Sequence, residues 1–356
     1  MTVSFPSVFA ASMTTAVTPT PLAEIETAVW AHYGIAATAS PLSSERDELF
    51  LLDAGRDERF VLRLANPADD PLVVDMQTHS LEWIAKMDPA LPVPRIVRSC
   101  TGESSLRLAL GGGAARIARL NVYLDGRPLP LAPRSAVQRR AIGAVLARLG
   151  LALRDFSNPS AQHVLAWDIQ HASCLQEILA SNSVAEWESQ RDWALVHKGL
   201  SRFEQAVKPH LAGLRSQVIH GDFNPHNILV GATDADSVTG VLDFGDMVHT
   251  PLINDLAIAA CYHVGEAHPL ADVADIVAGY HAVLPLLPDE IDLLYDLMVT
   301  RLCAAVAITE WRARRYPDNS LYILKNTGIA WTGLKGLAAI DQPQARQFLR
   351  AACQMK

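Results

Sequence analysis

The sequence predicts an α/β (α+β) protein with two lobes. The first is a small lobe built on an antiparallel sheet with helix packed against it, and the second is larger and mainly helical. Short apolar or alternating runs separated by turn residues occupy 35–123, which is the pattern of an antiparallel sheet. After residue 133, most segments are longer and place apolar residues at helical spacing. The loop 124–128 fits neither pattern, so we place the boundary there, with lobes at 21–124 and 125–356.

The first lobe is expected to contain one sheet and two helices. An opening helix at 21–33 ends at Gly34, and a second, amphipathic helix covers 71–88. Three glycines at 111–113 are not followed by Lys and then Ser or Thr, so we expect a hairpin tip rather than a P-loop. The strands are expected at 35–41, 48–53, 59–65, 91–97, 105–110 and 115–123.

The second lobe is expected to be helical around a few short strands. The apolar run 217–219 leads into a loop that Pro225 holds in a turn. Segments 228–230 and 238–242 read as a hairpin around a turn rich in Gly, Asp and Ser. The helices are expected at 133–153, 186–207, 253–262, 271–283, 288–315 and 320–337.

Residues 1–20 are expected to form a disordered leader. They lack the basic segment of a signal peptide, and Pro6 interrupts their apolar run. No apolar run approaches the ~20 residues that span a bilayer, so no membrane partner is expected. The net charge of −8 argues against a nucleic acid or an anionic membrane as partner.

The five cysteines are scattered and form no C-x-x-C pair, so neither a zinc site nor a disulfide framework is indicated. We expect reduced thiols in a cytoplasmic protein. The sequence leaves the oligomeric state open, with a homodimer as one option.

Two motifs lie close together in the second lobe. Residues 220–227 read H-G-D-x-x-x-x-N and residues 243–245 read D-F-G. They match the H-R-D-x-x-x-x-N and D-F-G signatures of protein kinases, with Gly221 in the place of the Arg. His220 is expected to pack and orient the loop rather than to act in catalysis.

These motifs carry the groups that phosphoryl transfer needs, since that chemistry depends on positioning and charge neutralisation. Asp222 is placed to accept the proton of an attacking hydroxyl. Asn227 and Asp243 supply oxygen ligands of the kind that Mg²⁺ prefers. Either motif alone could be a set of turn residues, but their order and the hairpin between them favour a catalytic site.

The motifs resemble those of the aminoglycoside phosphotransferase and choline kinase superfamily, which are small-molecule kinases with a protein-kinase-like fold. The segment TGVLDFGDM at 239–247 and the helix start LAIA at 256–259 are most similar to the hydroxylysine kinase group. The resemblance covers about residues 22–340. It implies Mg²⁺ as cofactor and ATP or GTP as phosphoryl donor.

The resemblance also implies nucleotide-binding groups in the first lobe. Arg63 stands where the family has a Lys or Arg that binds the α- and β-phosphates. The turn containing Ser43 and Ser44 would cover the phosphates, although on its own it reads as an ordinary polar turn. Backbone groups of Val122 and Tyr123 would bind the purine edge, which does not distinguish ATP from GTP.

One position departs from the family pattern. The helix at 71–88 usually carries a Glu that pairs with the phosphate-binding cation, but this chain has Gln77 at the aligned place. Asp75 and Glu82 are the nearby acids. The sequence therefore assigns no residue to pair with Arg63.

On the acceptor side, Asp246 directly follows D-F-G and would add negative charge for an amine on the acceptor. His226, Asp168 and Glu310 are further candidates. Asp168 could equally cap a helix. Glu310 lies on a long predicted helix where polar residues, Arg301 among them, are more often surface or structural ion-pair residues.

Three functions remain open at this stage. The favoured one is a kinase for a small amino alcohol or hydroxy amino acid, with 5-hydroxylysine as the best single guess. The second is an aminoglycoside phosphotransferase, which would need a large acidic acceptor pocket. The third is a nucleotide-binding pseudokinase scaffold, favoured by Gln77 alone and opposed by the complete set Asp222, Asn227 and Asp243.

Overall fold

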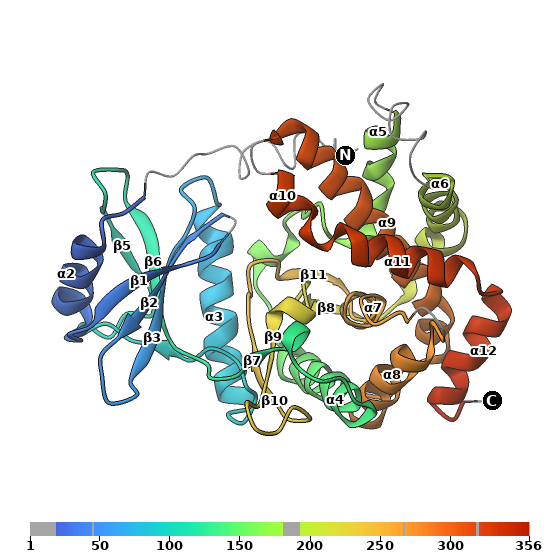
Figure 1. The fold of residues 1–356 in the computed structure, drawn as a ribbon, viewed down its shortest axis with the longest axis horizontal. Coiled ribbons are helices and arrows are strands. Elements are labelled where there is room, and N and C mark those ends of the chain that lie inside the picture. The colour runs from blue at the N-terminus through green and yellow to red at the C-terminus, as the bar shows by residue number, and fades with distance from the viewer. Residues whose placement is uncertain (1–18, 45, 181–192, 266–267, 318–319, 356) are drawn as a thin grey trace.

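The computed structural model describes residues 19–44, 46–180, 193–265, 268–317 and 320–355, which form two lobes side by side (Figure 1). The first lobe is built on an antiparallel sheet in the order β1-β2-β3-β6-β4, with β5 also paired to β6. Its strands are β1 (Thr38–Leu42), β2 (Glu48–Asp53), β3 (Arg59–Leu64), β4 (Ile96–Val97), β5 (Leu106–Leu108) and β6 (Arg116–Val122).

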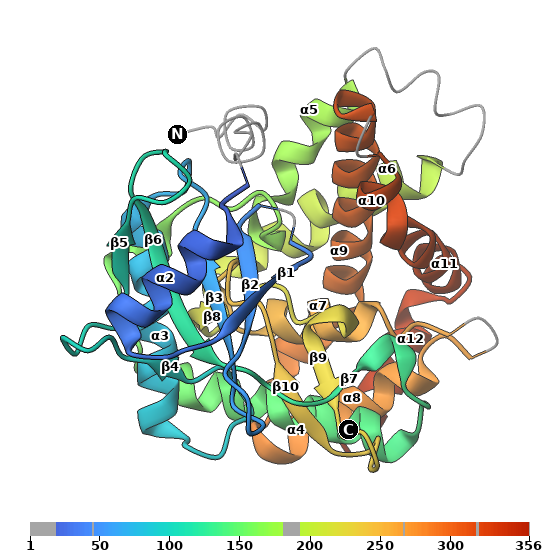
Figure 2. The ribbon, with the colours of Figure 1, turned by 60° about the vertical axis from the view of Figure 1, so that its left-hand side comes forward.

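Two helices cover the opposite faces of this sheet. Helix α2 (Leu22–Tyr33) packs on the outer face, and α3 (Pro71–Met87) lies between the sheet and the second lobe (Figures 1 and 2). Pro71 opens α3, and the Asp70 side chain accepts a hydrogen bond of 2.9 Å from the N–H of Leu72. The buried face of α3 belongs to the core of the second lobe, so this helix joins the two lobes.

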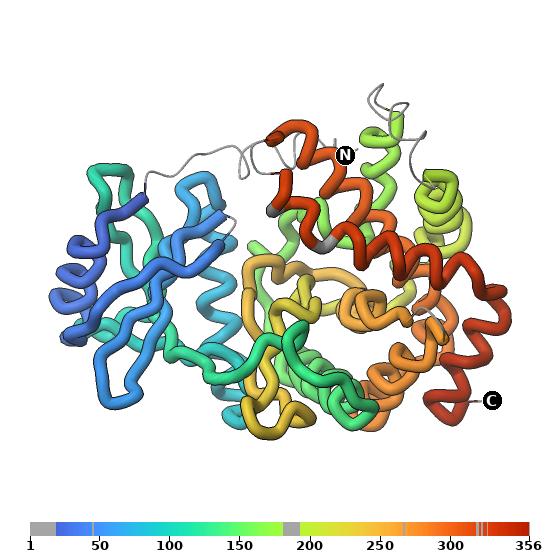
Figure 3. The backbone as a smooth tube through the Cα atoms, in the orientation of Figure 1, coloured from blue at the N-terminus to red at the C-terminus, as the bar shows by residue number. Residues whose placement is uncertain are grey.

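The second lobe is mainly helical around the long helix α9 (Figure 3). Most of α9 is buried, which fits its contacts with helices on several sides. The helices are α4 (Ala136–Leu153), α5 (Leu175–Ala180), α6 (Trp193–Arg202), α7 (Ile253–Cys261), α8 (Ala271–Val283), α9 (Pro288–Arg315), α10 (Ser320–Ile323), α11 (Thr327–Ala338) and α12 (Gln342–Ala352).

Short strands in the second lobe position the two sequence motifs. They are β7 (Arg127–Pro128), β8 (Ser216–Ile219), β9 (Ile228–Val230), β10 (Val238–Val241) and β11 (Val248–Pro251). Antiparallel pairing of β8 with β11 sets Ile219 opposite Val248. The loop that follows β8 and the D-F-G segment that precedes β11 therefore lie next to each other.

The predicted fold class is confirmed, and the glycines 111–113 lie in the turn between the antiparallel strands β5 and β6. The predicted strand 91–97 is wrong except at Ile96–Val97. Leu91 and Val93 are buried in the core of the second lobe without strand pairing. Strands β7 and β11 and helices α5 and α12 were not predicted.

Two predicted helices are interrupted. The prediction for 186–207 is described only from Trp193, because 181–192 lie outside the described residues, and α6 ends in a π turn at Phe203–Val207. The prediction for 320–337 spans α10 and α11, which a 3-10 turn at Leu324–Asn326 separates.

The predicted leader lies outside the described residues up to residue 18. Thr20, at its end, donates from its N–H and hydroxyl to the Glu48 carboxylate, both at 2.8 Å. The five cysteines all lie in the described residues, and none is joined to another by a disulfide. Among the described segments, no helix has the length and apolar character needed to cross a bilayer.

Candidate active site

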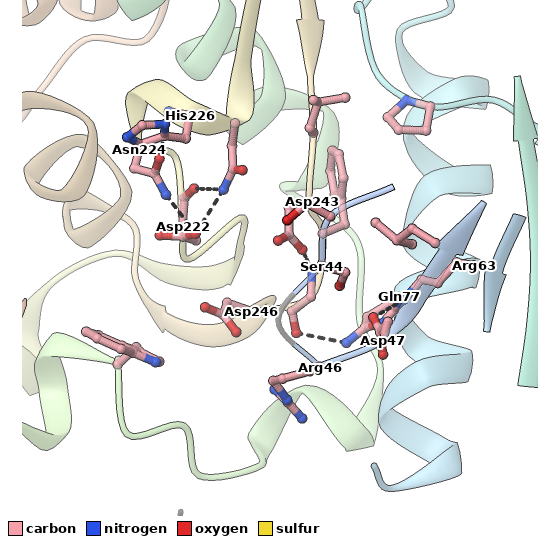
Figure 4. A pocket seen from close by; sticks show the side chains of 18 of the residues that line it. Ser44, Arg46, Asp47, Arg63, Gln77, Asp222, Asn224, His226, Asp243 and Asp246 are labelled. Atoms are coloured by element: carbon pink, nitrogen blue, oxygen red, sulfur yellow. Dashed lines mark hydrogen bonds and ion pairs between the residues drawn. The ribbon is translucent and has the colours of Figure 1, made fainter. Parts of the chain in front are cut away.

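A cavity of about 1020 Å³ lies between the lobes and collects the residues of both motifs. The first lobe contributes the β1–β2 turn, β3, α3 and β6, and the second lobe contributes the two motif loops and α9. Figure 4 shows Asp222, Asp243 and Asp246 on one side of this cavity, with Arg63, Gln77 and Asp47 on the other.

Asp222 is held by three donors at the cavity wall. Its Oδ2 accepts from Nδ2 of Asn224 at 2.8 Å and from Nδ2 of Asn227 at 2.9 Å (Figure 4). Its Oδ1 accepts from Nη2 of Arg301 at 3.0 Å. Burial raises the pKa of Asp222 to about 6, against the lowering effect of Arg301. The carboxylate is therefore fixed in direction and still ionised at neutral pH.

Asn227 and Asp243 fit the metal role predicted for them. The amide NH₂ of Asn227 donates to the main-chain and side-chain oxygens of Asp222, both at 2.9 Å, so its carbonyl oxygen is the atom available to a metal. Asp243 is exposed to the cavity and has a φ of 58°, a left-handed conformation that Asp tolerates better than most residues. A carboxylate and an amide oxygen are a suitable partial shell for a hard divalent cation.

His220 orients the motif loop as predicted. Its Nε2 is 2.9 Å from the carbonyl of Leu242, and its Nδ1 is 3.2 Å from the main-chain N–H of Asp222. Burial lowers the pKa of His220 to about 4, so the ring is neutral, with Nε2 as donor and Nδ1 as acceptor. Edge contacts with Phe223 and Phe244 complete its packing. The ring thus ties the two motifs together.

Asp255, at the start of α7, was not predicted to be part of the site. Its carboxylate accepts from the main-chain N–H groups of His220 and Gly221, each at 3.0 Å. Gly221 has a φ of 81°, and a Cβ on it would lie 2.1 Å from the carbonyl oxygen of Asp246. This close approach explains why glycine stands where protein kinases have Arg. An acid within a mostly apolar helix was the signal that the sequence offered.

Arg301 also has a larger role than predicted. Its side chain is 3 % exposed, with Nη2 on Asp222 and Nη1 donating to the carbonyl of Trp167 at 2.9 Å. The guanidinium lies over the Trp167 ring, 5.2 Å from its centroid. Of the two alternatives predicted for it, Arg301 is the structural ion-pair residue, and it positions Asp222.

The partner of Arg63, which the sequence left unassigned, is Asp47. Nε of Arg63 lies 2.6 Å from Oδ2 of Asp47, and Nη1 donates to Oε1 of Gln77 at 2.7 Å. Nε2 of Gln77 in turn donates to the carbonyl of Gly245 at 2.9 Å. Gln77 thus connects the cation to the D-F-G segment without charge, and the β1–β2 turn supplies the carboxylate. The β1–β2 turn, expected on its own to be an ordinary polar turn, therefore contributes the ion-pair partner of Arg63.

The other residues predicted to contact the nucleotide all line the cavity, namely Ser43, Ser44, Val122 and Tyr123. The main-chain N–H of Val122 donates to the carbonyl of Arg95 at 2.8 Å, and that of Tyr123 donates to the carbonyl of Arg59 at 3.0 Å. Both N–H groups are thus used within the protein. Any contact of these two residues with a purine edge would therefore have to use their carbonyl oxygens.

Two of the four acceptor-side candidates line the cavity, Asp246 and His226. Asp168 is 5 % exposed, accepts from the main-chain N–H of Gln170 and accepts from the Thr250 hydroxyl at 2.8 Å. It is therefore a capping residue, and its neighbour Trp167 lines the cavity instead. Glu310 lies on α9 between two lining residues, Thr309 and Arg312, and is not itself part of the lining.

The sequence profile of the phosphotransferase enzyme family matches residues 38–294, most of the chain and all of both motifs. The chain belongs to the phosphotransferase enzyme family. It is an enzyme that transfers a phosphoryl group to a hydroxyl of a small molecule. Membership also implies a nucleotide as donor and a divalent metal.

Three comparisons place this phosphotransferase among its relatives. It is 25 % identical to hydroxylysine kinase of Mus musculus over 331 residues, covering 86 % of each chain. It is 30 % identical to homoserine kinase of Methylobacillus flagellatus, covering 65 % of this chain and 66 % of the relative. The fold superposes on amicoumacin kinase hAmiN, solved with AMP-PNP, Ca²⁺ and Ami, with a TM-score of 0.65 at 13 % identity over 90 % of this chain and 95 % of that one.

Arg119 is a second cation that lines the cavity beside Arg63. Arg119 on β6 lies opposite Arg63 on the neighbouring strand β3. Arg119 is 6 % exposed, and its Nη1 donates a hydrogen bond to the Thr78 hydroxyl at 3.2 Å. Within the described ranges it has no ion pair, and its Nε has no hydrogen-bond partner. Burial, and then Arg63, lowers its pKa to about 9, so it is charged at neutral pH. The carboxylates of Asp47 and Asp243 raise this pKa but form no ion pair with Arg119. A buried charge without a direct partner is costly, and a bound phosphate would supply one.

We therefore expect Arg119→Met to weaken nucleotide binding by about 10- to 100-fold, the range for losing a hydrogen bond to a charged group. The melting temperature of the nucleotide-free variant should stay level or rise, because the buried charge is removed. Thermal melts with and without Mg²⁺-nucleotide measure both effects. A lower melting temperature with unchanged nucleotide affinity would show that Arg119 is only structural.

The pH dependence of activity should follow the ionisation of Asp222. A base must be deprotonated to accept a proton, so kcat/KM should rise with pH through an acid limb near pH 6 and then level off. Initial rates at subsaturating acceptor measure this profile. Asp246→Asn should retain the limb, since Asp222 remains. A limb that vanished in this variant would assign the titration to Asp246 instead.

Proposed function

We propose that this phosphotransferase transfers the γ-phosphoryl group of Mg²⁺-ATP or Mg²⁺-GTP to the hydroxyl of an amine-bearing small molecule, with 5-hydroxylysine as the first candidate acceptor. The observation that carries the proposal is the fixed carboxylate of Asp222, which faces the same cavity as Asp243 and Asn227. A protein that serves only as a scaffold would not need this complete arrangement.

In the proposed reaction, the acceptor hydroxyl donates its proton to Asp222 as its oxygen attacks the γ-phosphorus in line. The bond between that phosphorus and the β–γ bridging oxygen breaks, and the nucleoside diphosphate leaves. Arg301 and Asn224 keep the carboxylate aimed at the acceptor. A divalent metal held by Asn227 and Asp243 would neutralise phosphate charge.

On the nucleotide side, Arg63 and Arg119 are the cations proposed for the phosphates, and Ser43 and Ser44 of the β1–β2 turn line the same cavity. The carbonyl oxygens of Val122 and Tyr123 would face the purine. The neighbouring Asn121 side chain is 7 % exposed and lines the cavity. Its amide can donate or accept, so it suits adenine or guanine equally, and the donor must be decided by measurement.

The amine preference rests on Asp246. Its pKa is raised to about 7 by burial, and then by the charges of Asp222 and Asp243. An ammonium group beside it would compensate this crowding of negative charge. Two of the relatives named above are kinases of hydroxy amino acids, hydroxylysine and homoserine, which carry both an amine and a hydroxyl.

The test is a nucleotide-consumption screen with purified protein, Mg²⁺ and either ATP or GTP. The acceptors are 5-hydroxylysine, homoserine, choline, an aminoglycoside and a neutral sugar alcohol, and the Asp222→Asn variant is the blank. We expect 5-hydroxylysine to give the highest kcat/KM. Preference for the aminoglycoside would overturn the metabolic acceptor, and preference for the sugar alcohol would overturn the amine requirement.

A further inference from the structure

We propose that Arg46, in the β1–β2 turn, is a catalytic residue that binds the transferred phosphoryl group in the transition state. This inference rests on the proposed function, because it concerns the same phosphoryl transfer. It goes beyond that function in assigning a cation to the reacting group itself, whereas Arg63 and Arg119 are proposed for the phosphates of the bound nucleotide.

The main chain around Arg46 is anchored to the segment that follows β3. Nδ2 of Asn66 donates to the carbonyl of Arg46 at 2.9 Å, and the main-chain N–H of Asn66 donates to Oδ1 of Asp47 at 2.9 Å. Asn66 is 5 % exposed, and the other carboxylate oxygen of Asp47 is the one paired with Arg63. The turn is thus tied at several points, and Arg46 lines the cavity from a preorganised position.

The guanidinium of Arg46 is oriented by one carboxylate and keeps further donors. Its Nη2 is paired with Asp69, which also lines the cavity. Its Nε is buried and has no hydrogen-bond partner among the described residues, and its Nη1 makes no hydrogen bond within the same ranges. A guanidinium has five N–H groups in a planar fork, so Arg46 keeps its ion pair with Asp69 while it binds a phosphoryl oxygen.

Arg46 lies where the two sides of the cavity meet. Figure 4 shows it between Asp246, on the acceptor side, and Asp47, on the nucleotide side. Its charge acts on both sides, since burial raises the pKa of Asp69 and of Asp246, and Arg46 opposes the rise in each case. The γ-phosphoryl group passes from the nucleotide to the acceptor oxygen, so it crosses the region in which Arg46 lies.

The transferred group needs a cation in this region because carboxylates crowd its path. Asp222, Asp243 and Asp246 all line the cavity, and Arg301 is already engaged with Asp222. As the acceptor oxygen bonds to the γ-phosphorus and the bridging oxygen leaves, negative charge spreads over the three equatorial oxygens. Arg46 is placed to offset the repulsion between these oxygens and the carboxylates, which is strongest when the group lies between donor and acceptor.

The first experiment measures phosphoryl transfer by Arg46→Gln in the full-length protein, with Mg²⁺, 5-hydroxylysine and either ATP or GTP. We expect kcat to fall by about 10²–10³-fold, the range for losing one preorganised transition-state donor. The KM for the nucleotide should stay within a few-fold, because the interaction strengthens only in the transition state. The matched control is Arg107→Gln, which changes an exposed arginine of β5 outside the cavity lining and should alter neither quantity.

A binding measurement tests Arg46 without any acceptor except water. Aluminium fluoride with Mg²⁺-ADP or Mg²⁺-GDP mimics the phosphoryl group in the transition state, and AMP-PNP or GMP-PNP mimics the bound nucleotide. In calorimetric titrations, Arg46→Gln should weaken binding of the aluminium fluoride complex by about 10²–10³-fold. Binding of the imido analogue should weaken by only a few-fold.

Two further variants separate the contact with the phosphoryl group from the ion pair. Arg46→Lys keeps a charge but loses the planar fork, so it should recover part of the lost rate. Asp69→Asn removes the carboxylate that orients Arg46 and should lower kcat by about 10-fold, the lower end of the range for one charge-assisted hydrogen bond. In the Arg46→Gln background the same change should have little effect, because the residue that it orients is gone.

Equal weakening of the two kinds of analogue by Arg46→Gln would make Arg46 a ligand of the bound nucleotide and would overturn the catalytic role. Unchanged kcat and unchanged analogue binding would reduce it to the partner of Asp69. If melting shows that Arg46→Gln does not fold, Arg46→Lys decides by the same comparison, since it retains a cation for Asp69. Absence of turnover with 5-hydroxylysine in the wild type would count against the proposed acceptor, and the analogue titrations would still decide the role of Arg46.

Discussion

Replacing Asp222 by Asn should reduce kcat by about 10²–10⁴-fold, the usual contribution of a general base. The substitution removes a carboxylate that lines the cavity and is fixed by Arg301. Nucleotide affinity should stay within a few-fold, because Asp222 is not placed to bind the nucleotide itself. Single-turnover rates and calorimetric titration with Mg²⁺-nucleotide measure the two quantities separately.

Asn224→Ala is the control for the geometry of Asp222. It removes one donor to the carboxylate and leaves the base, Arg301 and Asn227 in place. Its activity should fall by less than about tenfold, in keeping with the modest net value of a single hydrogen bond. Retention of more than about a tenth of the wild-type rate by Asp222→Asn would contradict the base role, given the range for general-base catalysis.

The motif residues of the site could be predicted because they lie close to one another in the sequence. Asp222 and Asn227 belong to one short loop, and a hairpin of three- and four-residue strands returns the chain to Asp243. Residue types at fixed spacing therefore carried the prediction. His220 and Asn227 belong to this loop, and they form hydrogen bonds with Leu242 and Asp222, respectively.

Residues that reach the site from distant elements were not predictable in the same way. Arg301 contacts Asp222 across 79 positions and Asp255 contacts Gly221 across 34. Helical periodicity shows that α9 and α7 have buried faces, but not what those faces meet. A buried charge on an apolar face indicates a partner without identifying it.

The first lobe shows a similar limit. The acid that pairs with Arg63 was sought on α3, where the family has Glu, but it is Asp47 in the β1–β2 turn. Asp47 directly precedes β2, and the pairing of β2 with β3 brings it near Arg63. The alternation of apolar and polar residues along a strand does not by itself show which residues of two strands lie opposite each other. The prediction of a strand over 91–97 was wrong because Pro92 and Pro94 have no N–H to donate to a neighbouring strand. Both prolines are visible in the sequence.

Asp243→Asn should raise the Mg²⁺ concentration needed for half-maximal activity and lower kcat/KM by roughly 10²–10³-fold, equivalent to several kcal/mol of lost charge stabilisation. The physical reason is the loss of the only charge in the proposed metal shell, since Asn227 contributes a neutral oxygen. Asn is the informative substitution because it keeps a side chain that tolerates the φ of 58°, whereas Ala would add backbone strain. Rates measured over a Mg²⁺ titration at fixed nucleotide give the half-saturation point, and Asp155→Asn, an exposed carboxylate outside the cavity lining, is the charge-matched control. An unchanged Mg²⁺ requirement in Asp243→Asn would remove Asp243 from the metal site.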